Sequence, residues 1–321
     1  NRNKGLYIQI ENVTAEQFSA RLAAGRQPDI LTWPGGMVSP ETLPLVPIPF
    51  GQELETALVP AIPWAQDGAL AVPWVWGGTV VLINADMAAR RSAALPDGPG
   101  WTAEELLELA AQMEHRTGRS QSIQVYGIAA AGEGLLCFAV PGAVSLPDDV
   151  LDPASTLWQA WESFAGGRAG ILMGSQWEVA AIERLRGQGK GFEVLVMPVP
   201  RDLAQPLQVQ WMGVVDSGED ARSGMAVRFA ETLLSAENQS VISEKTGCLS
   251  ALRGKSGSDA VRDILLSAAA SGAVMLVNPL RQLAQTVALE AALGDEAARR
   301  AVSTRCFYVP PPCIQGGDDV E

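Results

Sequence analysis

Residues 71–86 constrain the fold of this chain more than any other stretch. Their second half, 79–83, is an unbroken run of β-branched and aliphatic side chains, typical of a strand buried on both faces. Their first half places Trp74 and Trp76 two residues apart, so both indoles lie on one side of an extended segment. Two glycines follow, and glycine lets backbone turn or approach a ligand closely. We therefore expect a ligand cleft beside this strand, where it crosses between two lobes.

The composition excludes several classes of protein. With 321 residues, the chain is long enough for one large or two medium domains, each with a core. Hydrophobic residues make up 47% and charged residues 18%, which excludes a disordered chain. The formal net charge of −13 argues against nucleic acid and anionic membrane surfaces as partners. No apolar run reaches the ~20 residues needed to span a bilayer.

The first ten residues and the cysteines say little about the cellular compartment. The chain starts with polar residues and lacks the apolar core of a signal peptide, so we expect any export signal or lipid-attachment cysteine to be absent from it. Cys306 and Cys313 flank three prolines and could close a small loop if oxidised. Cys137 and Cys248 fit free, buried thiols better. The pairing of the four cysteines stays open.

Strand and helix patterns alternate along the chain, which predicts an α/β protein. Residues 6–10 and 28–33 read as parallel strands around a helix that ends at Gly25, with Trp33 where α/β sheets bind ligands. Asp67-Gly68 predicts a hairpin turn. Further strands are expected at 125–131, 169–173, 192–196 and 208–215. Further helices are expected at 102–113, 157–164, 179–185, 223–234, 237–244, 259–270 and 280–292.

Residue types that often carry catalysis have simpler roles here. His115, the only histidine, falls near the C-terminal end of a predicted helix, where exposure and the helix dipole account for it. One histidine cannot supply a His-rich metal site. Ser175 lacks the second glycine of a nucleophile elbow and fits the N-cap of the next helix. Acidic residues at 216, 219 and 220 fit a solvated loop better than a carboxylate pair. We therefore expect no catalytic residue, metal or cofactor.

Nine tryptophans against three tyrosines give the clearest functional signal. Five lie at strand ends beside glycine or proline, namely Trp33, Trp74, Trp76, Trp177 and Trp211. Each alone is more often a packed indole, but their shared placement predicts a binding surface. An indole face stacks on the C–H surface of a sugar, and burying ~40–80 Å² there is worth roughly 1–2 kcal/mol. The other four, Trp64, Trp101, Trp158 and Trp161, are assigned to packing.

Short blocks in a fixed order across residues 6–252 carry a family resemblance. They include Pro28-Asp29-Ile30, Ala71-Val72-Pro73 before Val81-Leu82-Ile83-Asn84-Ala85-Asp86, Trp101-Thr102-Ala-Glu104-Glu105-Leu106, Gly167-Arg-Ala169-Gly-Ile171-Leu-Met173-Gly174-Ser-Gln-Trp177, Met197-Pro198-Val199-Pro200, residues 229–239 and 247–252. By these blocks the chain resembles an extracellular solute-binding protein of the family that includes maltose-binding protein and feeds ABC importers. It departs from that family in lacking the first strand and long opening helix, and in a short segment between Tyr126 and Ala169.

The resemblance implies an α/β, two-lobed, periplasmic-binding-protein-like fold (type II) with a ligand cleft between the lobes. The N-terminal lobe would comprise residues 1–79 plus 213–247, and the C-terminal lobe 80–212 plus 248–321. Chain crossings between lobes would lie near 79–86, 210–215 and 247–252. By the same resemblance, the ligand-binding residues would be Thr32, Trp33, Trp74, Trp76, Gln176, Trp177, Gln210, Trp211 and Asn278.

We therefore hypothesise a non-enzymatic, monomeric receptor, periplasmic or anchored at the cell surface as a lipoprotein. It would deliver a carbohydrate-like solute to the membrane subunits of an ABC permease. Within the same fold, a polyamine or peptide fragment is the alternative ligand. A glycoside-acting enzyme is the alternative from another class, but it needs two carboxylates about 5–9 Å apart, which the predicted cleft segments lack. A ligand-free interaction protein is the third hypothesis, suggested by the missing first strand.

Overall fold

The computed structural model describes residues 7–13, 15–34, 44–48, 70–117, 123–138, 147, 150–152, 154, 156–252, 259–271, 273–276 and 307–309. Its helices are α1 (Ala15–Ala23), α3 (Ala85–Arg91), α4 (Ala103–Met113), α5 (Glu133–Leu136), α6 (Leu157–Ala165), α7 (Gln176–Gly187), α8 (Asp220–Leu233), α9 (Ala236–Thr246) and α10 (Asp259–Ser271). Its strands are β1 (Ile30–Pro34), β2 (Leu45–Val46), β3 (Val72–Asn84), β4 (His115–Thr117), β5 (Ile123–Ala129), β6 (Ala169–Ser175), β7 (Val194–Met197), β8 (Ala204–Val215), β9 (Leu249–Ser250), β10 (Ala273–Leu276) and β11 (Phe307–Val309).

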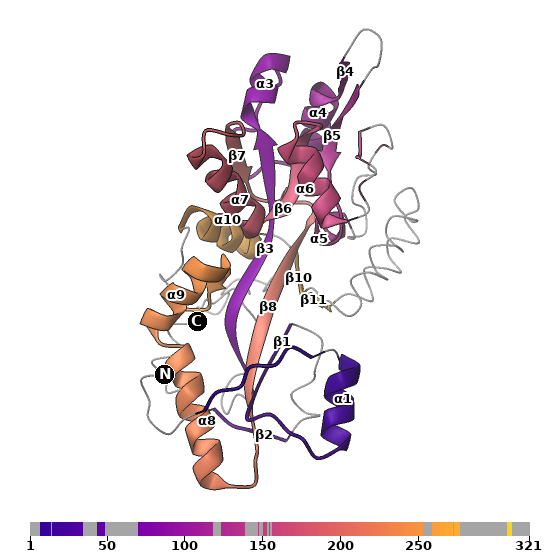
Figure 1. Cartoon of the computed structure of the whole chain (residues 1–321). Coiled ribbons are helices and arrows are strands. Elements are labelled where there is room, and N and C mark those ends of the chain that lie inside the picture. Colours follow the sequence, from indigo (N-terminus) through magenta and orange to yellow (C-terminus); the bar gives the residue numbers. More distant parts are fainter. Residues whose placement is uncertain are drawn as a thin grey trace, which may run out of the picture.

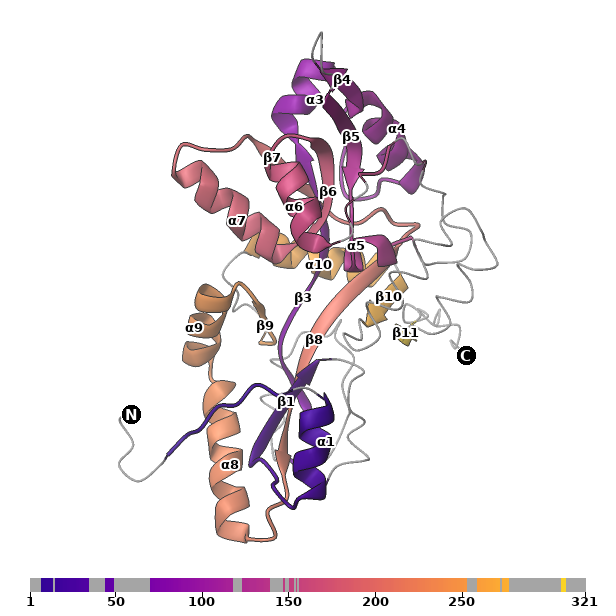
Figure 2. The same ribbon diagram turned by 45° about the vertical axis from the view of Figure 1, so that its right-hand side comes forward.

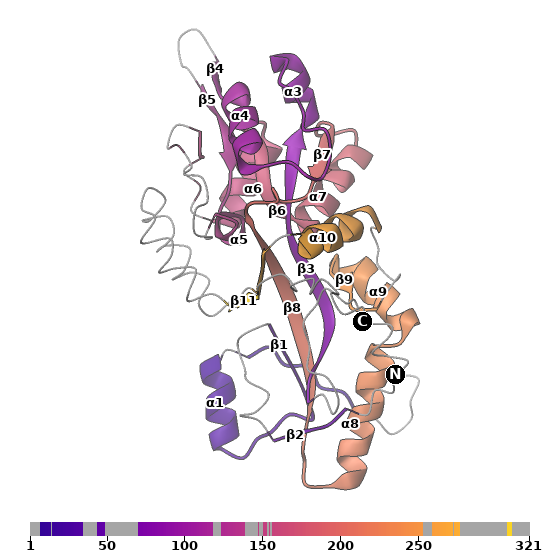
Figure 3. The same cartoon turned by 180° about the vertical axis from the view of Figure 1, so that it is seen from behind.

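Two long antiparallel strands, β3 and β8, connect the lower and upper parts of the molecule (Figures 1 and 3). At the lower end they meet β1, β2, α1 and α8; at the upper end lie β4 to β7 with α3, α4, α6 and α7 (Figures 1 and 2). Helix α9 lies beside the two strands between these ends. The predicted mixture of strands and helices is therefore confirmed, and β3 and β8 link the two ends.

The partners of β3 change along its length. From Val72 to Gly78 it pairs with β8, whereas Thr79 to Ile83 pair with β6 and the last residues with β7. The run from Thr79 onward is buried, with Val80, Leu82 and Ile83 fully covered. The predicted strand buried on both faces is confirmed. Its alternate side chains enter two different cores, because successive residues of a strand point to opposite faces.

Each face of the upper half of β3 packs on its own set of helices. Val81 and Ile83 belong to a core that includes Leu106 and Met113 of α4. Val80 and Leu82 belong to a second core, to which α6, α7 and α10 contribute. A third and smaller core joins the lower half of β3 and β8 to α8. The upper end of the molecule thus holds most of the described buried apolar surface.

Local signals placed most helix ends correctly. Thr102 caps α4 and forms a capping box with Glu105, as the sequence predicts. The helix before Gly25 is also confirmed, and Gly25 adopts the left-handed conformation (φ 69°) that suits glycine after a helix. His115, however, does not extend the helix end but begins β4. None of the described helices is long and apolar enough for a membrane crossing.

The expected parallel β-α-β unit at the start of the chain is wrong. Residues 7–10 form no strand, and Tyr7 and Ile10 are 84% and 89% exposed. Strand β1 instead pairs antiparallel with β8, with Trp33 opposite Trp211. The alternating pattern of residues 6–10 is local, whereas a strand also needs a neighbouring edge. At this end of the molecule, β8 supplies that edge to β1 and β2. The predicted Asp67-Gly68 hairpin, the helix at 280–292, Cys306 and Cys313 lie outside the described residues.

Candidate ligand site at the strand crossing

A pocket of about 200 Å³ opens where β3, β6 and β8 come together. Register explains its floor, because Thr79 of β3 lies opposite Ser175 of β6, and Gly77 lies opposite Gln208 of β8. The lining residues are Thr79, Gly134, Leu157, Met173, Gly174, Ser175, Trp177, Glu178 and Gln208. This surface combines one indole and two apolar side chains with hydroxyl, amide and carboxylate groups, a mixture typical of small-molecule sites.

The start of α7 fixes the polar wall of this pocket. The backbone N–H of Trp177 donates to the Ser175 hydroxyl (3.3 Å), and the backbone N–H of Ser175 donates to Glu178 Oε2 (2.8 Å). Ser175 is therefore the N-cap of α7, as predicted from the sequence. The Ser175 hydroxyl also donates to Glu178 Oε2 (2.5 Å). Both bonds use the same carboxylate oxygen.

The Trp177 indole connects α7 to the end of α9. Its Nε1–H donates to the carbonyl of Thr246 (3.0 Å). Its ring lies against Gly247, where a Cβ would stand 3.0 Å from the indole Cδ1 and where φ is +74°. Glycine is thus required at 247 by both backbone conformation and space. The indole remains 37% exposed, so its orientation is fixed while part of its surface stays open to the pocket.

Where β3 changes its pairing from β8 to β6, the side chains of two buried glutamines form hydrogen bonds with its backbone. The N–H of Gly78 donates to Gln176 Oε1 (3.1 Å), and Gln205 Nε2 donates to the carbonyl of Thr79 (3.0 Å). In an extended strand, the N–H of one residue and the carbonyl of the next point to opposite edges, so the two amides bond β3 from both sides. Within the described residues, Gln176 Nε2 and Gln205 Oε1 have no partner.

The two glycines of the crossing are explained by protein contacts. A Cβ at Gly77 would lie 1.9 Å from Gln176 Nε2, and one at Gly78 would lie 2.8 Å from Leu207 Cδ2. Only glycine leaves room for these neighbours. The close approach expected from the sequence is therefore made here by side chains of α7 and β8.

Comparison with known proteins identifies the family. Residues 2–263 match the profile of bacterial extracellular solute-binding proteins. The chain belongs to that family. No curated relative matches the sequence.

Solved structures share the fold of this solute-binding protein at low sequence identity. The maltose/maltodextrin-binding domain from Bdellovibrio bacteriovorus, bound to maltotriose, is 16% identical with a TM-score of 0.64, covering 94% of this chain and 92% of that one. The cyclic alpha-maltosyl-1,6-maltose binding protein from Arthrobacter globiformis is 18% identical with a TM-score of 0.61, covering 92% and 87%. A Mycobacterium tuberculosis protein in complex with glycerophosphocholine is 14% identical with a TM-score of 0.63, covering 91% and 85%. The predicted family and two-lobed receptor fold are confirmed.

The structure brings some of the predicted ligand residues to the pocket of the solute-binding protein. Trp177 lines it, and Gln176, the first residue of α7, is 4% exposed and accepts from the N–H of Gly78 on β3. Gln210 is half-buried and two residues from the pocket residue Gln208, on the same face of β8. Sequence reasoning missed Gln208, although the alternation of Gln208 with Gln210 carries that signal.

The other predicted residues lie on the lower half of the crossing strands or beyond it. Trp33 and Trp76 are 3% and 2% exposed, so protein atoms cover both indoles in this conformation. The Trp76 Nε1–H donates to the carbonyl of Ser250 (2.9 Å). The remaining positions are the exposed Thr32, the half-buried Trp74 and Trp211, and Asn278, which lies outside the described residues. A ligand contact for each of these stays a prediction.

The packing assignments of four other tryptophans have mixed outcomes. Trp101 is 3% exposed and donates to the carbonyl of Pro198 (2.8 Å), and Trp161 packs on the second core, so both are confirmed. Trp158 is 66% exposed, and its assignment to packing is wrong. It stands in the first turn of α6, where a helix-spacing argument does not determine which face meets the core. Trp64 lies outside the described residues.

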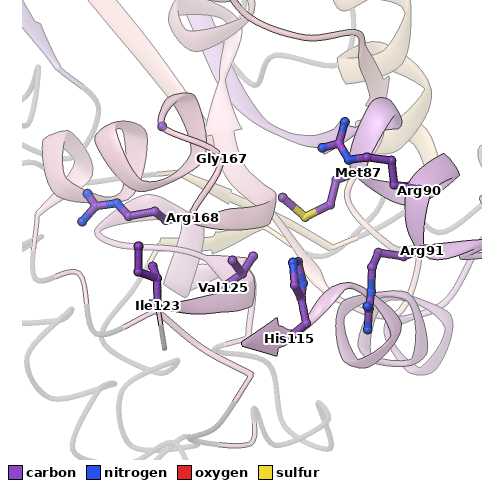
Figure 4. Close-up of a pocket in the computed structure, with 9 residues that line it drawn as sticks. Met87, Arg90, Arg91, His115, Ile123, Val125, Gly167 and Arg168 are labelled. Carbon is purple, nitrogen blue, oxygen red and sulfur yellow. The ribbon is translucent and has the colours of Figure 1, made fainter. Parts of the chain in front are cut away.

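A larger pocket of about 600 Å³ lies at the upper end of the solute-binding protein, away from the crossing. Figure 4 shows its basic side chains, which come from α3, β4 and the turn after α6. None of the predicted ligand residues lines it. His115, expected at an exposed helix end, is half-buried in this pocket and lies with Nδ1 2.7 Å from the Met113 carbonyl.

The described residues include no group of three histidine, cysteine or acidic side chains that could hold a metal ion. Cys137 is buried and Cys248 is half-buried, and neither forms a disulfide bond within the described part of the chain. At the lower end, the hydrogen bond and charge of Asp29 raise the pKa of Arg222, which contacts it from α8 (Nε–Oδ1 2.5 Å).

Proposed function

We propose that this solute-binding protein is a receptor for a carbohydrate-like solute, which it holds in the pocket at the strand crossing and delivers to an ABC permease. The observation that carries the proposal is the state of Trp177. Its indole N–H is already bonded to Thr246, while part of the ring stays exposed beside polar pocket residues. A fixed, partly open indole next to hydrogen-bonding groups suits the C–H face and the hydroxyls of a sugar ring.

The other lining residues supply complementary hydrogen bonds. Gln208 can both donate and accept, the Thr79 and Ser175 hydroxyls add further groups, and Glu178 Oε1 is not used by the helix cap. No arginine or lysine is among the described lining residues, which disfavours an anionic solute. The volume of about 200 Å³ is at the small end for ligand pockets and favours one or two sugar rings over a long oligosaccharide.

Sugar-bound relatives support the same ligand class. The similar structure from B. bacteriovorus is bound to maltotriose. Of the alternatives, a polyamine would need several carboxylates, and a glycoside-acting enzyme would need two; the described pocket lining has Glu178 alone. We further propose that the protein is a monomer at the cell surface or in the periplasm. Its two lobes would be divided between residues 79 and 80, 212 and 213, and 247 and 248.

A ligand screen followed by a pair of substitutions tests this function. Thermal-shift measurements with mono- and disaccharides, amino acids and polyamines would first identify the solute, since a ligand that binds only the folded state raises Tm. Calorimetry would then compare Trp177→Ala with Trp177→Phe. We expect at least tenfold weaker binding for the alanine variant and a smaller loss for phenylalanine, which keeps a smaller aromatic face and lacks the pyrrole ring with its N–H. An unchanged Kd in Trp177→Ala would remove this residue from the site, and products formed during incubation would indicate an enzyme.

A further inference from the structure

The pocket at the upper end of the molecule departs from the charge balance of the chain. The sequence carries 36 acidic residues against 23 lysines and arginines. Nevertheless, the pocket of about 600 Å³ is lined by three arginines and the only histidine, with no carboxylate among its described lining residues. These residues are Arg90, Arg91, His115 and Arg168, together with Met87, Ile123, Val125, Gly166 and Gly167 (Figure 4).

Part of this basic character supports local structure. Arg91 Nε donates to the carbonyl of Gln112 (3.4 Å), and His115 Nδ1 donates to that of Met113 (2.7 Å), so both cap the end of α4. Each cap uses one nitrogen. The terminal nitrogens of Arg91 and the Nε2 of His115 have no bond recorded in the described part of the chain. Capping therefore anchors these two side chains at the pocket without using all of their donors.

The other two arginines have no such structural role. The side chains of Arg90 and Arg168 are exposed and form no hydrogen bond or ion pair with the described residues. Figure 4 shows them on opposite sides of the pocket, Arg168 after α6 and Arg90 on α3. Two acidic residues are adjacent in sequence to lining residues, and neither lines the pocket. Asp86 Oδ2 accepts from the backbone N–H of Glu193 (3.4 Å), and Glu114 accepts from Gln124 Nε2 (2.7 Å). Among the described lining residues, the three guanidinium groups thus have no counter-charge.

We propose that this pocket binds a phosphate ester. Guanidinium groups match phosphate oxygens with paired hydrogen bonds, and three of them favour a dianion over a singly charged group. The volume far exceeds that of phosphate alone, and the buried Met87 and Val125 with the 57% exposed Ile123 provide an apolar surface for a carbon body. The ester is either a free small molecule or the head group of a lipid, which present the same chemistry. The proposal does not depend on the solute bound at the crossing.

Two double variants with equal charge change test this site. Arg90→Ser with Arg168→Ser alters the pocket, whereas Arg184→Ser with Arg186→Ser alters exposed arginines of α7 outside it. Calorimetry with phenyl phosphate should show saturable binding in the wild type and the α7 variant, and at least tenfold weaker binding in the pocket variant. The folding and the solute affinity at the crossing should be unchanged in both variants.

Further probes distinguish the two sources of the ester and the ways in which the proposal fails. Cosedimentation with phosphatidylcholine vesicles that contain phosphatidic acid, reduced in the pocket variant, would assign the ester to a lipid. Phenyl phosphate binding without cosedimentation would assign it to a free molecule. No saturable binding of either probe, or an equal loss in both variants, would overturn the proposal, as would binding of an acidic peptide in place of both probes.

Discussion

The two halves of β3 are built differently although they belong to one strand. From Thr79 onward, every residue is buried, strands pair with both edges, and side chains fill two helix-covered cores. Before Gly78, the strand carries an irregularity between Pro73 and Val75. There Val72 and Trp74 pack on the third and smaller core, and only Trp76 reaches the second core. At the junction, Gln176 and Gln205 supply the hydrogen bonds that strands supply elsewhere.

This difference indicates where the molecule is rigid and where it can bend. Repacking the upper half of β3 would disturb two close-packed cores, which resist deformation. At the junction, each glutamine has one buried polar atom without a partner among the described residues. Such atoms cost about 1–3 kcal/mol when they cannot reach another group. We therefore expect motion between the two ends of the molecule to be concentrated at Gly77–Thr79, beside the proposed solute pocket.

The largest effect should come from the rigid half. Leu82 is fully buried in the second core, so Leu82→Ala removes apolar contacts and leaves a cavity. We expect a loss of about 2–5 kcal/mol in the free energy of unfolding, measured by urea denaturation. If Leu82→Ala lowered the free energy of unfolding by less than a substitution at an exposed site does, the upper half of β3 would relax easily around the cavity. The two halves of β3 would then not differ in rigidity.

A smaller loss is expected at the junction, where the packing is tight against a single side chain. Gly77→Ala would bring a Cβ within 1.9 Å of Gln176 Nε2. Moving the Gln176 amide aside would weaken the bond that its Oε1 accepts from the N–H of Gly78. We expect destabilisation of about 1–3 kcal/mol in the same urea assay. Solute affinity should fall as well, because Gln176 precedes the pocket residue Trp177.

Gly224→Ala is the matched control for that substitution. Gly224 lies inside α8, with open space around the position of its Cβ. Alanine there should stabilise the protein by up to about 1 kcal/mol, since glycine is a poor helix former. Equal losses at 77 and 224 would show that the Gln176 contact is not what requires glycine at the junction.

The sequence predicts those features of the fold that depend on residues close together in the chain. The buried run at 79–83, the capping box of Thr102 with Glu105 and the N-cap role of Ser175 all follow from local patterns. The bonds of Gln205 to Thr79 and of Trp76 to Ser250 do not, because they join residues 126 and 174 positions apart. The same limit explains the error at the start of the chain, where the partner of β1 is the distant β8. Tryptophan placement predicts one binding surface, but burial separates the exposed Trp177 from the covered Trp33 and Trp76, because a strand-end position does not determine how much protein covers an indole.

The smallest effect, and the sharpest test of the junction, comes from comparing two buried glutamines. Gln239 has both amide atoms bonded, donating to the carbonyl of Leu233 (3.1 Å) and accepting from the Ser250 hydroxyl (2.8 Å). Gln205 Nε2 donates to the carbonyls of Thr79 (3.0 Å) and Pro206 (3.3 Å), while its Oε1 lacks a partner among the described residues. Methionine has a similar shape without an amide, so Gln239→Met loses two satisfied bonds. Gln205→Met also loses two donated bonds, but it removes a buried oxygen that had no partner among the described residues.

We therefore expect Gln205→Met to cost about 1 kcal/mol in urea unfolding and Gln239→Met clearly more. A loss at 205 equal to or above that at 239 would mean that Gln205 Oε1 is satisfied in solution. The junction would then be as well bonded as the rest of β3. If the loss at 205 is smaller than that at 239, as expected, local stability is low where β3 changes its partner from β8 to β6. Solute binding beside this point can then shift the upper end of the molecule relative to the lower end at little energetic cost.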